Sequence, residues 1–262
     1  MPPHPWWLRP IMGAVAVVRI ALATTVMLVG MLAILLLAPF PMSVRGVHLA
    51  AWPLTAMARL LLFFLGVRIT AHRPERIREH RGVVVANHLS FLDIPLLLRT
   101  VPLRFLSTIG VKTYPVIGWI ARAVGTLFVD RTSSISRGRA MQQMERALAA
   151  EPYPALAVFA EGGIGPGDRV QAFRTGAFRL AADTGLDVLP VALRYSRPEV
   201  ALWKEEPPVR VLWRVATRLR PIRATIVPLD VPALPDDVEA WAEAAQEAVA
   251  EAVRLPAAEF EG

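Results

Sequence analysis

A histidine followed five residues later by an aspartate is the pair most able to do chemistry in this sequence. His88 comes directly after Asn87 and the apolar run Val83–Ala86, and Asp93 follows it. Such a run is typical of a buried strand, so we expect His88 at the end of a strand. A helix beginning in the next turn would bring the Asp93 carboxylate to the imidazole. A carboxylate on one ring nitrogen fixes the tautomer and stabilises the imidazolium, which makes the other nitrogen a general base near neutral pH.

Two further polar clusters come directly after short apolar runs. They are Asp130-Arg131 and Glu161-Gly162-Gly163. Sites in α/β sheets form just beyond the ends of the strands, so both clusters can lie near His88. Plainer interpretations exist for each cluster: a solvated Arg at a turn, a glycine-rich surface loop, and a surface His beside a helix-capping Ser90.

The second and third clusters are suited to an anionic ligand. An Arg at the end of a buried strand, such as Arg131, can grip an anion such as a phosphate in a cleft. Gly162 and Gly163 let backbone amides approach the same group closely. Arg174 and the start of a predicted helix add positive potential. Glu161 could orient Arg131 or a substrate hydroxyl.

Apolar strand-like runs alternate with helical stretches from residue 81 onward. This alternation predicts an α/β fold with a mostly parallel sheet flanked by helices. The expected strands are Val83–Ala86, Arg104–Ser107, Leu127–Val129, Ala155–Ala160, Val188–Leu193, Val209–Val215 and Ala224–Val227. The expected helices are Ile94–Arg99, Val116–Val124, Ser136–Ala150, Thr175–Thr184 and one from Asp236 or Asp237 to about Arg254.

Residues 1–80 are predicted to anchor residues 81–262, the globular domain, to a membrane. Ile20–Pro39 is uncharged and long enough to cross a hydrocarbon core, which needs ~20 residues. A second, interrupted apolar stretch at Val47–Val67 favours an interfacial or re-entrant helix packed on the first. A cleaved signal peptide is disfavoured because the apolar run is long and no small-residue cleavage site follows it. The Arg excess after the first run places the domain on the cytoplasmic side of the inner membrane, although a hairpin would weaken that rule.

The composition indicates which partners the chain can have. Of 262 residues, 54% are hydrophobic, the mean hydropathy is +0.42 and the net charge is +7. A basic, apolar chain with no tandem basic-aromatic module favours membrane lipids as partners over nucleic acid. The absence of Cys excludes disulfides and thiolate chemistry. The four other His residues lie in or just after the anchor without ligand spacing, so we expect no metal.

Four blocks in the expected order resemble the glycerolipid, or lysophospholipid, acyltransferase superfamily, and most closely its bacterial 1-acyl-glycerol-3-phosphate acyltransferases. The blocks are Asn87–Asp93, Phe128–Arg131, Phe159–Gly163 and Leu189–Val191. The resemblance implies that His88 and Asp93 are the catalytic pair and that Arg131 contacts the substrate phosphate. The residues expected to bind substrate are Asn87, Ser90, Arg131, Glu161, Gly162, Gly163 and Arg174.

The resemblance also implies a reaction. His88 would remove a proton from the free hydroxyl of a lysophospholipid, 1-acyl-sn-glycerol-3-phosphate in the first instance, which then attacks an acyl thioester of coenzyme A or acyl carrier protein. No cofactor beyond that co-substrate is implied. The third block has Gly163 and Ile164 where the family usually has Thr and often Arg. Its Glu-Gly-x-x-x-x-Gly shape also resembles members that use lyso-ornithine lipid. A catalytically silent membrane lipid-binding protein is the alternative from another class.

Overall fold

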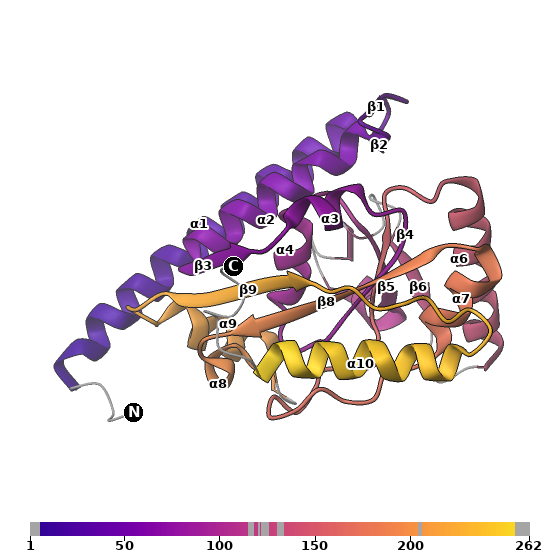
Figure 1. The fold of residues 1–262 in the computed structure, drawn as a ribbon. Helices are drawn as coiled ribbons and strands as arrows, with labels where there is room; N and C mark the ends of the chain where they lie inside the picture. Colours follow the sequence, from indigo (N-terminus) through magenta and orange to yellow (C-terminus); the bar gives the residue numbers. More distant parts are fainter. Residues whose placement is uncertain are drawn as a thin grey trace.

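Seven strands form the main sheet of the computed structural model, in the order β3-β9-β8-β4-β7-β5-β6 (Figure 1). The structure describes residues 6–114, 118–119, 121, 126–129, 134–203 and 206–254. The strands are β3 (Val67–Ala71), β4 (Gly82–Ala86), β5 (Arg104–Thr108), β6 (Leu127–Val129), β7 (Leu156–Phe159), β8 (Asp187–Tyr195) and β9 (Ile222–Pro228). Neighbouring strands pair in parallel except β8 and β9, which are antiparallel. The predicted mostly parallel α/β sheet is therefore confirmed.

Helices cover both faces of this sheet. They are α1 (Arg9–Leu37), α2 (Trp52–Phe64), α3 (Pro74–Glu79), α4 (Asp93–Leu98), α6 (Ser134–Ala150), α7 (Gly176–Thr184), α8 (Pro198–Ala201), α9 (Pro208–Ala216) and α10 (Val238–Arg254). Short 3₁₀ turns occupy Trp6–Leu8, Leu49–Ala51 and Ile109–Thr113, and a two-stranded hairpin, β1 (Ser43–Val44) and β2 (Val47–His48), lies beyond the end of α1. Asp237 caps α10 as expected, because its Oδ1 accepts a hydrogen bond of 3.0 Å from the Ala240 N–H.

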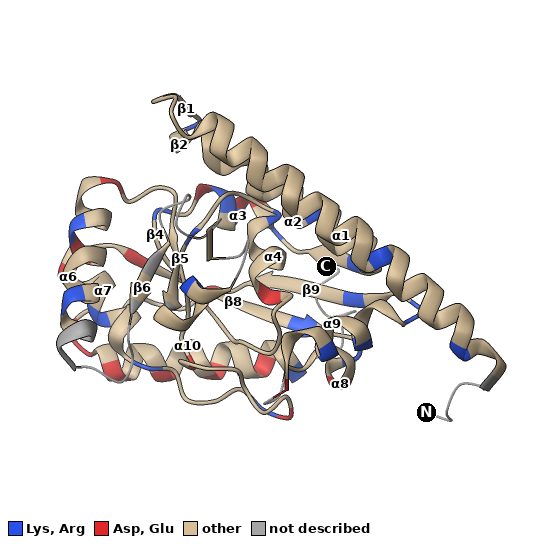
Figure 2. Cartoon of the chain, turned by 180° about the vertical axis from the view of Figure 1, so that it is seen from behind, with Lys and Arg blue, Asp and Glu red and all other residues tan. Residues whose placement is uncertain are grey.

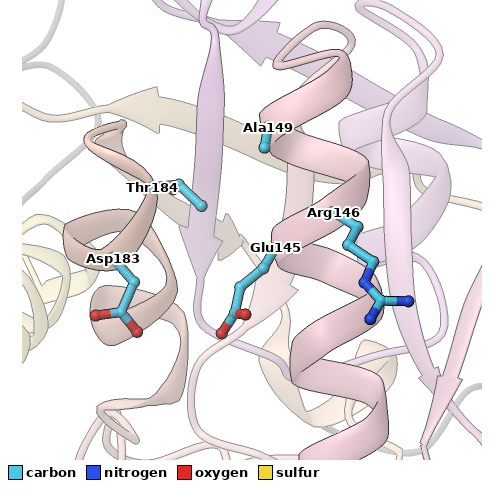
Figure 3. A pocket seen from close by; sticks show the side chains of 5 residues that line it. All are labelled: Glu145, Arg146, Ala149, Asp183 and Thr184. Atoms are coloured by element: carbon cyan, nitrogen blue, oxygen red, sulfur yellow. The ribbon is translucent and has the colours of Figure 1, made fainter.

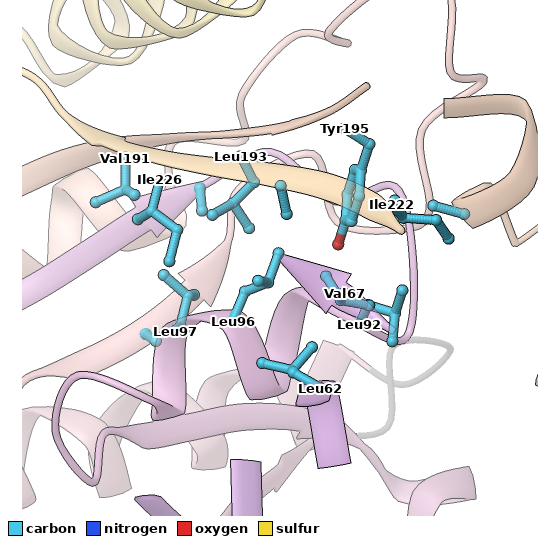
Figure 4. Close-up of a cluster of buried hydrophobic side chains, with 14 of the residues drawn as sticks. Leu62, Val67, Leu92, Leu96, Leu97, Val191, Leu193, Tyr195, Ile222 and Ile226 are labelled. Carbon is cyan, nitrogen blue, oxygen red and sulfur yellow. The ribbon is translucent and has the colours of Figure 1, made fainter. Parts of the chain in front are cut away.

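The central strand β4 is buried on both faces, which explains its unbroken apolar run. Val84 and Ala86 point into one cluster with side chains of α2 and α4, while Val83 and Val85 point into the other with α7 and α10. Figure 4 shows part of the first cluster, with Tyr195 extending among the aliphatic side chains. Burial from both sides makes β4 a rigid support for the residues that follow it.

Two expectations about the chain need correction. Val209–Val215, expected as a strand, is helix α9. Its alternating pattern is deceptive, since Val211 and Val215 are the buried positions and Val209 and Trp213 are exposed, which is a helical spacing. Pro208 at the first helical position also favours a helix start. The helix expected at Val116–Val124 falls largely outside the described residues.

The N-terminal segment, predicted as an anchor, also contributes a strand to the sheet. β3 lies within residues 1–80 and pairs with β9 at the sheet edge. Helix α1 is long and apolar enough to cross a membrane, and most of it is exposed. A signal sequence near an N-terminus can pass the same test of length and hydropathy, so α1 by itself does not establish an anchor. As expected, α2 packs against α1, with Met31 and Ile34 of α1 meeting Leu54 and Met57.

Candidate active site

The loop between β4 and α4 brings His88 and Asp93 together. His88 Nδ1 lies 2.8 Å from Asp93 Oδ2, as the spacing predicts. The same oxygen accepts hydrogen bonds from the backbone N–H groups of Leu89 at 2.6 Å and Ser90 at 2.8 Å. Asp93 therefore holds both the imidazole and the backbone of the turn that carries it.

Tyr195, at the end of β8, completes the surroundings of the Asp93 carboxylate. Its hydroxyl donates a hydrogen bond to Asp93 Oδ1. Asp93 is fully buried, and four donors replace the water that its carboxylate has lost. Burial, and secondly the charge of Asp93, raises the pKa of Tyr195 well above 10, so the hydroxyl stays a donor. Sequence reasoning missed Tyr195, because a Tyr closing an apolar strand gives no signal of its partner about 100 residues away.

The imidazole of His88 is held flat and only one of its nitrogens is occupied. The ring stacks on Phe159, with centroids 3.9 Å apart and planes 10° from parallel, and its side chain is 15% exposed. Because Nδ1 donates to Asp93, the lone pair of the neutral ring is on Nε2. Within the described part of the chain no group hydrogen-bonds to Nε2. That atom is therefore available to a substrate proton.

Glu161 fixes the backbone of His88. Its Oε1 accepts from the His88 N–H at 2.7 Å and its Oε2 accepts from the Gln171 N–H at 2.9 Å. Burial raises the pKa of Glu161, and the two backbone donors partly offset that shift. Gly165 N–H in the glycine-rich loop also donates to the His88 carbonyl at 2.6 Å. Both carboxylate oxygens of Glu161 thus accept from backbone N–H groups. The expected role of Glu161, to orient Arg131 or a substrate hydroxyl, stays a prediction, because Arg131 lies outside the described residues.

Asn87 and Ser90 support the same loop from inside. The Asn87 amide makes two hydrogen bonds with the backbone of Leu193 in β8, donating at 2.9 Å and accepting at 2.8 Å. Ser90 is fully buried, and its Oγ accepts from the Leu92 N–H at 3.3 Å. In the structure these polar groups bond to backbone inside the protein, and substrate binding by Asn87 and Ser90 stays a prediction. They shape the turn that presents His88.

The glycine-rich loop and Arg174 do lie at the surface. Gly162 has a φ of +76°, which favours glycine, and a Cβ there would lie 2.2 Å from Arg174 Nε, so a side chain at this position would displace Arg174. Gly163 is exposed with open space around it, and Arg174 is exposed. An exposed guanidinium over a glycine-rich turn suits a polar or anionic headgroup. Arg131, the other predicted anion contact, lies outside the described residues.

Two further features of the described structure bear on where a site can lie. In the described segments no group of three or more His, Asp or Glu is placed to hold a metal ion. A shallow hollow of about 480 Å³ lies between α6 and α7, lined by Glu145, Arg146, Ala149, Asp183 and Thr184 (Figure 3). None of these residues belongs to the His88 site, so the hollow and the site are separate.

Comparisons with known proteins identify the family. A family model described as Acyltransferase matches residues 68–194, which contain His88, Asp93 and Glu161. The chain is 33% identical over 205 residues to a lyso-ornithine lipid O-acyltransferase of Rhodobacter capsulatus, a match that covers 72% of each protein. The chain belongs to the Acyltransferase family. The resemblance seen in the four sequence blocks is thereby confirmed.

Other relatives of this acyltransferase differ in their named acceptors. It is 35% identical over 156 residues to a lyso-ornithine lipid O-acyltransferase of Pseudomonas aeruginosa, covering 58% of this chain and 56% of that protein. A 1-acyl-sn-glycerol-3-phosphate acyltransferase of Neisseria meningitidis is 30% identical over 141 residues, a match that covers 53% of this chain and 54% of that protein. The matches to these two relatives thus span little more than half of their length.

A solved structure shares the fold. The crystal structure of the 1-acyl-sn-glycerophosphate acyltransferase PlsC from Thermotoga maritima superposes with a TM-score of 0.70, covering 95% of this chain and 98% of that one. Sequence identity between the two is 21%, so this likeness shows the fold alone.

Proposed function

We propose that this acyltransferase moves a fatty acyl group from a thioester to the free hydroxyl of a lysolipid, with His88 as general base. The observation that carries the proposal is the imidazole whose Nδ1 is tied to buried Asp93 while Nε2 is left to a substrate. Family membership supports acyl transfer as the reaction class.

The proposed step uses the two substrates and His88. The lysolipid hydroxyl gives its proton to His88 Nε2 while its oxygen bonds to the thioester carbonyl carbon. The carbon–sulfur bond then breaks, and the departing thiolate takes the proton from the imidazolium. General-base help contributes ~10²–10⁴-fold, and positioning of the two substrates adds to it. The proposed donor is acyl-CoA or acyl carrier protein, both of which are acidic and suit a chain of net charge +7.

Lyso-ornithine lipid is the acceptor that two observations favour. Two relatives, at 35% and 33% identity, carry that activity in their names. The glycine-rich loop has Ile164 where members that use lysophosphatidate often have an Arg. Lysophosphatidate is the second candidate, because the exposed side chains of Arg169 and Arg174 lie on the same loop and could hold a phosphate.

An acceptor screen tests the proposal. Purified protein receives one labelled acyl-CoA and, in parallel, lyso-ornithine lipid, lysophosphatidate and lysophosphatidylethanolamine. The proposal expects a labelled diacyl product from at least one lysolipid, and most product from lyso-ornithine lipid. No product from any acceptor with either acyl-CoA or acyl carrier protein would instead support a catalytically silent lipid-binding protein.

We also propose the inner membrane, with the sheet domain on the cytoplasmic side, as the location. The exposed apolar length of α1 and the lipid substrates named for its relatives support a membrane location. The Arg residues that follow α1 support the orientation.

A further inference from the structure

Helix α9 and the turn that follows it have an exposed apolar and basic surface that the site does not use. Val209 is 64%, Trp213 44% and Leu219 39% exposed. Residues 207–223 contain five Arg and no Asp or Glu. We call Val209, Trp213, Leu219, Arg210 and Arg220 the α9 surface; all five are exposed.

The α9 surface adjoins helix α1. Arg19 in α1 donates through Nη1 to the carbonyls of Ala216, at 3.1 Å, and Arg218, at 2.6 Å, at the end of α9. Where α1 passes α9 it exposes Val17, Val18 and Leu22. Figure 2 shows the two helices side by side, with basic positions gathered around α9. A lipid surface that covers this part of α1 therefore reaches α9.

We propose that the α9 surface is a second membrane-contact element, whose partner is the headgroup layer of an anionic bilayer. A Trp with one exposed edge settles at headgroup depth, and aliphatic neighbours insert just below it. Each Arg near an anionic lipid surface adds electrostatic attraction. Exposed apolar and basic side chains suit such a surface better than a protein partner of mixed charge, and the carboxylate of neighbouring Glu206 is already paired with Arg214.

The buried side of α9 connects this surface to the His88 loop. Arg214 donates to the carbonyls of Val200, at 3.0 Å, and Leu202, and pairs with Glu206 at 2.6 Å. Trp203, which follows Leu202, donates its backbone N–H to the Leu89 carbonyl at 3.0 Å. A bilayer touching α9 therefore lies close to the turn that carries His88. This step rests on the proposed function, because it places the mouth of that site at the lipid surface.

Lipid contact can be measured without any enzymatic assay. Because the chain has no Cys, a single introduced Cys can be labelled at one chosen position. Val209→Cys, Trp213→Cys, Leu32→Cys in exposed α1 and Glu247→Cys in exposed α10 each accept one environment-sensitive fluorophore. The full-length proteins are reconstituted in phosphatidylglycerol vesicles with or without nitroxide-labelled lipid. We expect a blue shift and loss of fluorescence at positions 209, 213 and 32, and neither at 247.

The proposal would be overturned if the labels at positions 209 and 213 were no more quenched or blue-shifted than the label at position 247 while the label at position 32 was quenched. A blue shift in detergent without vesicles that grows with protein concentration would also overturn it, because that would mean that a second copy covers α9. In a separate assay, Val209→Asp with Trp213→Asp should raise the apparent KM for a long-chain lysolipid in vesicles but not for a short-chain, water-soluble one. If the labels at positions 209 and 213 were quenched but the unaltered protein transferred no acyl group, the proposed function would be contradicted and the membrane contact of α9 would be supported.

Discussion

At the scale of single residues, the proposed general-base role of His88 depends on which of its ring nitrogens carries the proton. Asp93 accepts from Nδ1, so Nε2 is the basic atom, and everything around Asp93 serves to keep that arrangement. Tyr195 holds one carboxylate oxygen, and the backbone of the turn holds the other. Glu161 then fixes the His88 backbone. The sequence could predict the His–Asp pair from its spacing, but it could not predict Tyr195, which depends on the pairing of β4 with β8.

Tyr195→Phe should lower kcat by about 10-fold with little change in the KM for lysolipid. It removes one of four donors to Asp93 while leaving the substrate surface intact, and a 10-fold effect corresponds to ~1.4 kcal/mol. Steady-state kinetics with the preferred acceptor measures both constants. Tyr114→Phe, at an exposed position, is the matched control and should behave like the unaltered protein. Unchanged kcat in Tyr195→Phe would show that Asp93 needs no help from Tyr195.

The raised pKa of Tyr195 predicts how stability changes at alkaline pH. Because the folded state holds this proton more tightly than the unfolded state, stability is full below pH 10 and falls as the pH rises above it. The loss approaches ~1.4 kcal/mol per pH unit. Urea unfolding in detergent from pH 9 to 11 should show a steeper decline for the unaltered protein than for Tyr195→Phe. Parallel declines would contradict the buried, Asp93-bound hydroxyl.

Glu161→Gln should reduce kcat and lower stability together. An amide offers one acceptor oxygen, so one of the two backbone N–H groups of His88 and Gln171 is left facing an N–H₂ group. A buried donor without a partner costs ~1–3 kcal/mol. Thermal unfolding and kcat are the readouts, and Glu243→Gln at the surface is the control. A Glu161→Gln protein as stable and active as the control would mean that the loop holds its shape without Glu161.

At the scale of elements, strands were easier to predict than their boundaries and neighbours. β4, β6 and β7 were expected from apolar runs, because strands buried on both faces have that signature. The strand predicted at Val209–Val215 is wrong, because a short segment with alternating apolar and polar residues can also form a helix that buries Val211 and Val215 on one face. β3 was missed as a sheet strand, since a half-exposed edge strand following an apolar helix resembles its continuation.

The start of β4 makes a test at this scale. Gly82 has a φ of +133°, and a Cβ there would lie 2.5 Å from the Asp187 carbonyl of the paired strand β8. Gly82→Ala should therefore reduce the free energy of unfolding by roughly 1–3 kcal/mol through backbone strain. Gly138→Ala in α6, where a Cβ meets nothing within 4 Å, should instead gain ~0.5–1 kcal/mol. Chemical denaturation of the two proteins compares them; equal stabilities would contradict the close approach of β4 and β8.

At the scale of the whole molecule, the fold gathers four distant segments at one point. Residues 87–93, the loop after β7, the end of β8 and residues 202–203 meet around His88 through the bonds of Glu161, Gly165, Tyr195 and Trp203. The order of these segments along the chain could be recognised from the sequence as that of a family. The hydrogen bonds that join the segments could not be predicted from the sequence. Asn87 and Ser90 illustrate the limit, because residue type alone does not show whether a polar side chain faces substrate or the interior.

Arg19 ties α1 to the end of α9, so α1 and the sheet domain are packed together and not joined by a loose linker. If α1 and the α9 surface contact lipid as proposed, the proposed lysolipid can keep its acyl chain in the bilayer while its headgroup reaches His88.

Acyl transfer by His88→Ala tests directly whether His88 is the general base. The unaltered protein and the variant are reconstituted in the same vesicles with labelled acyl-CoA, or labelled acyl carrier protein, and the preferred lysolipid, and diacyl product is followed over time. We predict that His88→Ala loses transfer by ~10²–10⁴-fold while its unfolding and membrane attachment stay unchanged. Product formation at the unaltered rate by the folded, membrane-bound variant would contradict the assignment of His88 as the base.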